Sequence, residues 1–170
     1  MLVEEPRYEV LKRIDSVEIR KYPPMLLATA MGDSDPFGLL FRYISGANNG
    51  GRKISMTAPV ITPEKIAMTA PVFTRGNTMS FVTPSSYTRV TVPEPTDPHI
   101  TIEEVPARTL AVLRFSGWAR DATVEEKKKI LLATLARNSL KVKGEAVLMR
   151  YNPPFTPWFL RRNEVAIEVE

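Results

Sequence analysis

The fold is decided by two stretches of the chain, IRKYPPMLLAT at residues 19–29 and IEEVPARTLAV at residues 102–112. Laid over one another at a constant offset of 83 residues, they match at an isoleucine, a proline, a leucine and an alanine. Both are extended segments, and the alternation VEIR at residues 17–20 has the period of a half-buried strand. The repeat predicts two similar halves, at about 8–92 and 100–170.

A short helix is expected after the first stretch. Ser34-Asp35-Pro36 is a typical helix start, because an oxygen-bearing side chain caps the first turn and proline fits the first helical position. Gly46 is expected to end this helix. Four apolar side chains recur at i, i+3, i+4 and i+7 and are expected to form its buried face: Phe37, Leu40, Phe41 and Ile44.

A second helix follows the second stretch, and the chain then returns to strands. Thr123 and Glu126 have the spacing of a capping box, and the helix they begin is expected to bury Val124, Leu131 and Leu135. Each half thus runs as strands, one helix and more strands. This order predicts an α+β domain, a curved sheet or distorted barrel with two helices outside and a ligand cleft where sheet and helices diverge.

An eight-residue motif, Lys-Ile-Ser/Ala-Met-Thr-Ala-Pro-Val, occurs twice inside the first half, in KISMTAPVIT at residues 53–62 and KIAMTAPVFT at residues 65–74. Each copy is a strand-like segment stopped by proline, which is confined to strand edges, ends or bulges. One interpretation is a tandem hairpin with edge prolines. The other is a rim that carries Met56 and Met68 towards a ligand, although filling irregular gaps is the commoner use of methionine.

Composition places residues 1–170 in one globular domain, with 44% hydrophobic and 25% charged residues. The absence of cysteine excludes disulfides, thiolate metal sites and cysteine nucleophiles, and the single histidine, His99, excludes multi-histidine metal sites. The net charge of +4 is modest and its lysines and arginines are scattered, so nucleic-acid binding is not expected.

The first residues, the longest apolar run and the polar motifs of the sequence bear on location and on function. The first residues are acidic where a signal peptide would be basic, and the longest apolar run, residues 23–31, is too short to span a bilayer. These features predict a soluble, cytoplasmic protein without a membrane span. No nucleophile–base signature and no glycine-rich phosphate loop occurs in the sequence, which favours a binding protein over an enzyme.

The last distinctive motif of the sequence is RYNPPFTPWFLRRNEV at residues 150–165. Together with YISGAN at residues 43–48 and the doubled Lys-Ile-Ser/Ala-Met-Thr-Ala-Pro-Val, it closely resembles the SOUL/heme-binding protein family, from about residue 8 to residue 169. The resemblance implies an internally duplicated α+β domain, a distorted antiparallel β-barrel flanked by two α-helices. It also implies a relation in shape to bacterial effector-binding domains.

The same resemblance implies that the ligand is heme or another tetrapyrrole. In vertebrate members the ligand lies on an apolar patch of the first helix, with basic residues near its propionates. Carried over through the match at residues 42–44, this patch corresponds to Phe37, Leu40 and Phe41, with Arg42 nearby. No histidine lies on or near this helix, so the resemblance assigns no axial ligand to the iron.

Several other side chains are candidates with two interpretations each. Met56 and Met68 either ligate iron or line a pocket through their thioethers, or they only fill gaps. Trp158 belongs to a rigid loop that either walls a planar ligand or covers the end of the barrel. Arg161 and Arg162 either hold carboxylates in a bidentate fork, or at least one of them pairs with Glu164 or an acidic neighbour and anchors the last strand. His99 is a weak candidate for a metal ligand, because a loop histidine is usually exposed to solvent.

These observations lead to three hypotheses. The first is a soluble carrier or buffer for heme or a related tetrapyrrole. The second is a binding module for another small planar or amphipathic effector. The third is a tetrapyrrole-modifying enzyme, for example one that removes the metal.

Overall fold

The structure is a computed structural model that describes residues 4–31, 35–49, 66 and 68–170. The elements up to residue 95 are β1 (Glu9–Ile14), β2 (Val17–Tyr22), β3 (Met25–Ala30), α1 (Pro36–Ile44), β4 (Asn48–Asn49), β5 (Val72–Arg75), β6 (Thr78–Val82) and β7 (Glu94–Pro95). Those that follow are β8 (Ile100–Val105), β9 (Arg108–Phe115), α2 (Asp121–Arg137), β10 (Val142–Arg150), the 3-10 turn η1 (Trp158–Leu160) and β11 (Asn163–Val169). Most of the doubled motif Lys-Ile-Ser/Ala-Met-Thr-Ala-Pro-Val, including Met56, lies outside the described residues.

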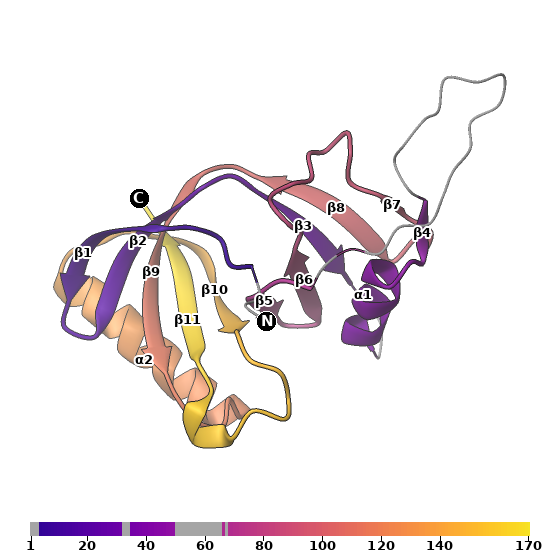
Figure 1. Cartoon of the computed structure of the whole chain (residues 1–170). Coiled ribbons are helices and arrows are strands. Elements are labelled where there is room, and N and C mark those ends of the chain that lie inside the picture. Colours follow the sequence, from indigo (N-terminus) through magenta and orange to yellow (C-terminus); the bar gives the residue numbers. More distant parts are fainter. Residues whose placement is uncertain (1–3, 32–34, 50–65, 67) are drawn as a thin grey trace, which may run out of the picture.

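Nine of the strands form one antiparallel sheet in the order β1-β2-β9-β11-β10-β5-β6-β3-β8. Figure 1 shows this sheet as a long, bent surface with α2 against one part and α1 beside the other. The α+β class and the two flanking helices are therefore confirmed. The expected barrel is not closed, because closure needs the first and last strands to pair and here the edge strands β1 and β8 each pair with only one neighbour.

The two repeated stretches pair with each other twice in this sheet, through β2 and β9 near one edge and through β3 and β8 at the other. Tyr22 of β2 is opposite Arg108 of β9, and Met25 of β3 is opposite Val105 of β8. The prolines between these pairs fall in the gap where both strands are interrupted, as expected for a residue without a backbone N–H. If a two-fold axis relates the halves at an offset of 83 residues and Tyr22 pairs with Arg108, Met25 must pair with Val105, as it does. The duplication itself stays a prediction.

The buried apolar side chains form three clusters along the sheet. One lies under α2 and contains Leu131 and Leu135, and another lies under α1 and contains Leu40 and Tyr43. The third joins the two halves, with Leu27 from β3 and Leu110 from β9 among its members. The described helices include none that is both long and apolar enough to cross a lipid bilayer.

Helix α1 begins as predicted but turns a different face to the sheet. The Asp35 carboxylate accepts a hydrogen bond from the Gly38 N–H at 2.9 Å, and Pro36 is the first helical residue. The buried face carries Leu39, Leu40, Tyr43 and Ile44. Phe37 and Phe41, predicted to be buried, are instead 43% and 52% exposed.

The rotation of α1 has a polar cause. Apolar residues occupy almost the whole circumference of this helix, so their spacing alone does not fix which side faces the sheet. The buried Tyr43 hydroxyl needs a hydrogen-bond partner, and it donates to the Pro93 carbonyl at 2.6 Å. This bond holds Tyr43 inward and leaves Phe37 and Phe41 on the outer side.

Helix α2 buries Val124, Leu131 and Leu135, as predicted, but begins earlier than expected. Its first residue is Asp121, because the Val124 N–H already donates to the Arg120 carbonyl at 2.9 Å. Thr123 therefore lies inside the first turn and does not form the predicted capping box. The N-cap residue is Arg120, whose side chain makes no capping hydrogen bond.

Candidate functional site

An apolar cavity of about 410 Å³ lies between α1 and the segment that follows β10. Its first wall is the outer face of α1, with Phe37 and Phe41. Its second wall is residues 150–154, and its floor comes from residues 68–72 and from Met79 of β6. Ligand pockets in proteins have volumes of roughly 300–1,000 Å³ and mostly apolar linings. This cavity therefore has the size and the chemistry of a small-molecule site.

The α1 wall is built from two aromatic rings. The rings of Phe37 and Phe41 are nearly parallel, with centroids 6.2 Å apart, because the two residues stand one helical turn apart. The edge of Phe37 also contacts Phe81 of β6, with ring centroids 5.5 Å apart. About half of each phenylalanine remains exposed, so this wall is open to solvent on one side.

The opposite wall is a rigid loop. Pro153 and Pro154 limit its backbone freedom, and the side-chain oxygen of Asn152 accepts a hydrogen bond from the Arg162 N–H at 2.6 Å. The Arg162 guanidinium lies over the Tyr151 ring, 3.9 Å from its centroid. The loop is thus attached to the start of β11 and presents a fixed surface to the cavity.

Beneath the loop, Tyr151 belongs to a buried charge network centred on Glu164, which is 0% exposed. The two Glu164 oxygens accept hydrogen bonds from Arg20 Nη1 and Nη2, both at 2.9 Å. The Tyr151 hydroxyl donates to Glu164 at 2.7 Å, and Arg162 donates to it at 3.0 Å. A buried carboxylate with this many charged donors is fully satisfied and holds its partners in place.

The network fixes the protonation states of its members. Burial alone would raise the pKa of Glu164, but the hydrogen bonds and charges of Arg20, Tyr151 and Arg162 outweigh it and hold this pKa below its ordinary value. Burial and the negative charge of Glu164 raise the pKa of Tyr151. Glu164 is therefore ionised and Tyr151 protonated near neutral pH, so Tyr151 acts as the hydrogen-bond donor.

The structure brings some of the sequence-predicted site residues together and separates others. Phe37, Phe41 and Met68 line the cavity. Leu40 does not, since it is completely buried beneath α1. Arg42 is exposed on α1 and lines none of the cavities described here, and Met56 lies outside the described residues. The site role of each residue stays a prediction.

Trp158 and His99 also lie elsewhere. Trp158 is in η1, 53% exposed, with its ring packed edge-on against Phe159. His99 is exposed before β8, and its Nδ1 is 2.9 Å from an Asp97 oxygen. Among the described residues, no group of three or more histidine, aspartate and glutamate side chains is arranged to hold a metal ion.

Sequence reasoning missed Val72 and Met79 in the cavity and the central position of Glu164. Val72 and Met79 lie on neighbouring short strands and carry no pattern that marks a site. The signal for Glu164 was available, because NEVAIEV at residues 163–169 places a carboxylate inside an otherwise buried strand. The prediction that Arg161 or Arg162 pairs with Glu164 is confirmed for Arg162.

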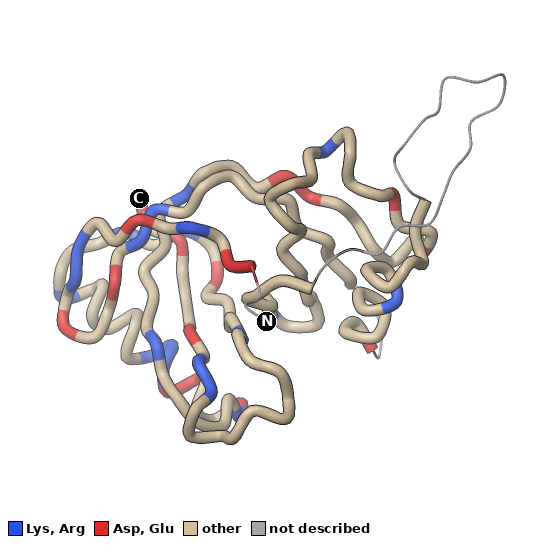
Figure 2. Tube along the Cα trace, viewed as in Figure 1, with Lys and Arg blue, Asp and Glu red and all other residues tan. Residues whose placement is uncertain are grey.

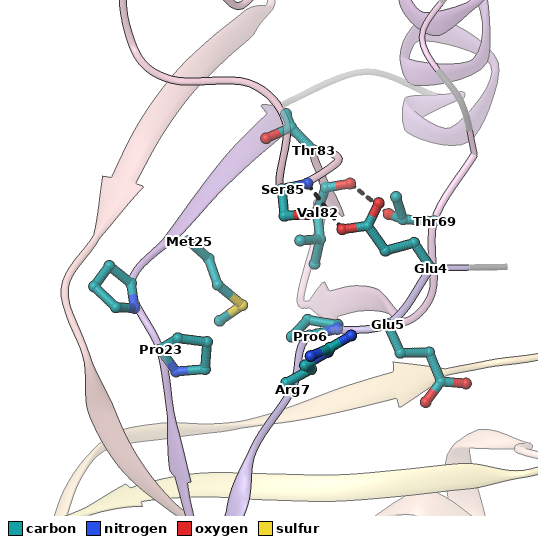
Figure 3. Close-up of a pocket in the computed structure, with 11 residues that line it drawn as sticks. Glu4, Glu5, Pro6, Arg7, Pro23, Met25, Thr69, Val82, Thr83 and Ser85 are labelled. Atoms are coloured by element: carbon teal, nitrogen blue, oxygen red, sulfur yellow. Dashed lines mark hydrogen bonds between the residues drawn. The ribbon is translucent and has the colours of Figure 1, made fainter.

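A second, more polar cavity of about 500 Å³ lies beneath the N-terminal segment (Figure 3). Glu4, Glu5 and Arg7 form one side of it, and the side chain of Met25 lies on the other. The Ser85 N–H donates to a Glu4 oxygen at 2.9 Å and attaches the segment to the loop after β6. Its mixed charges make it a poorer match for an apolar ligand than the cavity beside α1.

Charged residues are also distributed unevenly over the molecule. Figure 2 shows many charged residues along β1, β2, β9 and α2, and few around α1, β3 and β6. The apolar cavity therefore opens beside the less charged part of the molecule, and of the described residues that line it only Arg150 carries a charge.

Comparisons with known proteins agree on family and fold. The family described as SOUL heme-binding protein matches residues 3–168. Heme-binding protein 1 of Xenopus laevis is 29% identical over 126 residues, which are 74% of this chain and 65% of that protein. The match thus spans less than two thirds of this relative's length. The crystal structure of the EcmrR C-terminal domain superposes with a TM-score of 0.59 at 12% identity, over 96% of this chain and 98% of that one.

Proposed function

Because this chain belongs to the SOUL heme-binding protein family, we propose that it binds heme or a related tetrapyrrole in the apolar cavity beside α1. The observation that carries this proposal is the pair of stacked, half-exposed rings of Phe37 and Phe41 facing a proline-rich wall. Two flat apolar walls complement the faces of a planar macrocycle. The open side of the α1 wall would let the ligand exchange, which supports a role as carrier or buffer.

The lining favours binding over chemistry on the ligand. In the described part of the chain, no histidine and no carboxylate lines this cavity. The macrocycle fits the apolar walls, whereas an iron ligand is offered only by soft thioethers such as that of Met68. We therefore expect apolar contact with the ring, and not iron ligation, to supply most of the affinity.

A porphyrin titration tests the site. Hemin added to the pure protein is expected to give a saturable change in its Soret absorption. Phe41→Asp should weaken binding at least about tenfold, because it replaces an aromatic contact by a charge. Leu132→Asp is the matched control, since Leu132 is also a partly exposed apolar side chain on a helix, at 41%. Equal affinity of Phe41→Asp and the wild-type protein would exclude this site.

A second titration separates ring contact from iron ligation. Metal-free protoporphyrin IX is expected to bind within a few-fold of hemin, followed by its fluorescence. Met68→Leu keeps the apolar volume without the sulfur and should change neither affinity. A large preference for hemin that Met68→Leu abolishes would show that the iron is ligated by this side chain.

A further inference from the structure

A third cavity, of about 300 Å³, lies behind the loop that walls the apolar one. Three arginines line it: Arg120, Arg150 and Arg161. We propose that this arginine pocket binds an oxyanion, a carboxylate or a phosphate group. Arg150, Asn152 and Pro154 line both cavities, so the two sites are neighbours across the 150–154 segment.

No carboxylate of the described residues compensates the charge of the pocket. Arg20, Arg89 and Arg162 each form an ion pair with a carboxylate. Within the described residues, Arg120, Arg150 and Arg161 form none, and no acidic side chain lines their cavity. Three like charges around one small space repel one another, and a bound anion would relieve that repulsion.

The guanidinium groups are held in position by neutral partners. Arg161 donates from Nε to the Thr156 carbonyl at 2.9 Å and from Nη2 to the Pro154 carbonyl at 2.6 Å. It also lies over the Trp118 ring, 4.6 Å from the centroid. These bonds use two of its five N–H donors. Arg161 is therefore oriented without being neutralised, as a preorganised anion site requires.

The N-terminus of α2 adds to the positive potential at the arginine pocket. β9 ends, α2 begins and η1 turns at this end of the molecule (Figure 1). Arg120 is the N-cap residue, and its side chain leaves the first-turn N–H groups uncapped. The positive end of the helix dipole thus lies beside the arginines. Asp121 is exposed, does not line the cavity and forms no ion pair with the described arginines.

The anion has two possible sources of the same chemistry. It is either an acidic arm of the ligand in the apolar cavity, in which case the inference rests on the proposed function, or a separate small anion. Trp118 lines the arginine pocket and reports on it, and Trp158→Phe would make it the sole tryptophan of the chain. Fluorescence and calorimetry of this variant can then follow inorganic phosphate at constant ionic strength.

The test combines this anion probe with two porphyrins. Phosphate is expected to bind saturably, and Arg120→Gln should weaken it about tenfold because a charged donor is lost. Arg114→Gln is the matched control, since Arg114 is exposed on β9 and lines neither cavity. Mesoporphyrin IX and its dimethyl ester, which lacks the free carboxylates, are titrated with and without phosphate.

Each outcome decides between the sources or rejects the pocket. Competition of phosphate with the diacid but not with the ester would place an acidic arm in the pocket. Phosphate binding without competition would support a separate anion. Phosphate binding with no porphyrin binding would reject the proposed function and leave the pocket standing. If phosphate does not bind, and Arg120→Gln changes the affinities for the diacid and the ester equally, the arginine pocket is rejected while the proposed function stands.

Discussion

Glu164 is the residue on which the wall of the candidate site depends. Its carboxylate is completely buried and accepts hydrogen bonds from Arg20, Tyr151 and Arg162. Glu164→Gln keeps the shape but removes the buried carboxylate partner of Arg20, whose charge is then paired only with the partly exposed Glu18, 2.7 Å away. Breaking a buried ion pair in this way costs about 3–5 kcal/mol of stability. We expect a loss in this range at pH 7, measured as the free energy of unfolding in urea.

The same residue sets a dependence on pH. Its pKa is lower in the folded protein than in the unfolded chain, so its stabilisation is present above the unfolded pKa and is lost as pH falls through the folded pKa. The wild-type protein should therefore lose stability in acid more steeply than Glu164→Gln. Glu94→Gln removes an exposed carboxylate that pairs with Arg89 and serves as control. Parallel acid profiles for the wild-type protein and Glu164→Gln would contradict this role.

Local sequence rules identified Glu164 only as a partner for an arginine. Its pairing with Arg162 two residues away was predictable, because side chains two residues apart in an extended segment lie on the same side. Its bidentate pairing with Arg20 joins residues far apart in the chain and depends on β9 lying between β2 and β11. No local pattern contains that order, so the network could not be read from the sequence.

At the scale of elements, the sequence of α1 predicted that a helix forms there but did not determine which side of it faces the sheet. Capping by Asp35 and Pro36 fixed the start of the helix, whereas the side that faces the sheet was decided by the Tyr43 hydroxyl and its bond to Pro93. The sequence placed Leu40 and Phe41 on one patch. In the structure, Leu40 packs in the core, whereas Phe41 lines the cavity.

Two truncations on α1 test this division. Leu40→Ala removes a completely buried side chain and should destabilise the protein by about 2–5 kcal/mol while leaving the porphyrin affinity of the folded fraction unchanged. Phe41→Ala removes a half-exposed ring, should cost less than about 1 kcal/mol and should weaken porphyrin binding. Urea unfolding and hemin titration measure both effects. A stability loss of about 2–5 kcal/mol for Phe41→Ala as well, with unchanged porphyrin affinity, would favour the orientation predicted from periodicity, in which both side chains are buried.

At the scale of the whole molecule, the class of the fold was predictable because the repeated stretches contain four of its strands, β2, β3, β8 and β9. Residues 19–29 and 102–112 pair with each other, and a helix follows each of them. Closure was not predictable, since it depends on whether β1 and β8 meet, and the alternation of a strand does not tell which neighbour it finds. The arginine pocket likewise arises only when the loop after β10 folds against the start of α2.

The apolar cluster that joins the two halves also predicts that they unfold together. Leu27 of β3 packs in one cluster with Leu110 of β9 and Met149 of β10, so the core is continuous between them. Both tryptophans, Trp118 and Trp158, lie in the second half and report on it alone. Leu27→Ala damages the first half and should lower the stability by about 2–5 kcal/mol. In a cooperative domain the tryptophan signal must follow this loss.

The measurement is urea unfolding of Leu27→Ala followed by tryptophan fluorescence and by far-ultraviolet circular dichroism. We expect both midpoints to fall by the same amount, because unfolding of either half exposes the shared cluster. Leu131→Ala, which truncates a buried side chain under α2, is the reciprocal variant and should also move both signals equally. A fluorescence midpoint that stays at the wild-type value in Leu27→Ala would show that the second half holds its structure alone. The cavity wall at residues 150–154 would then be stable without the helix that faces it.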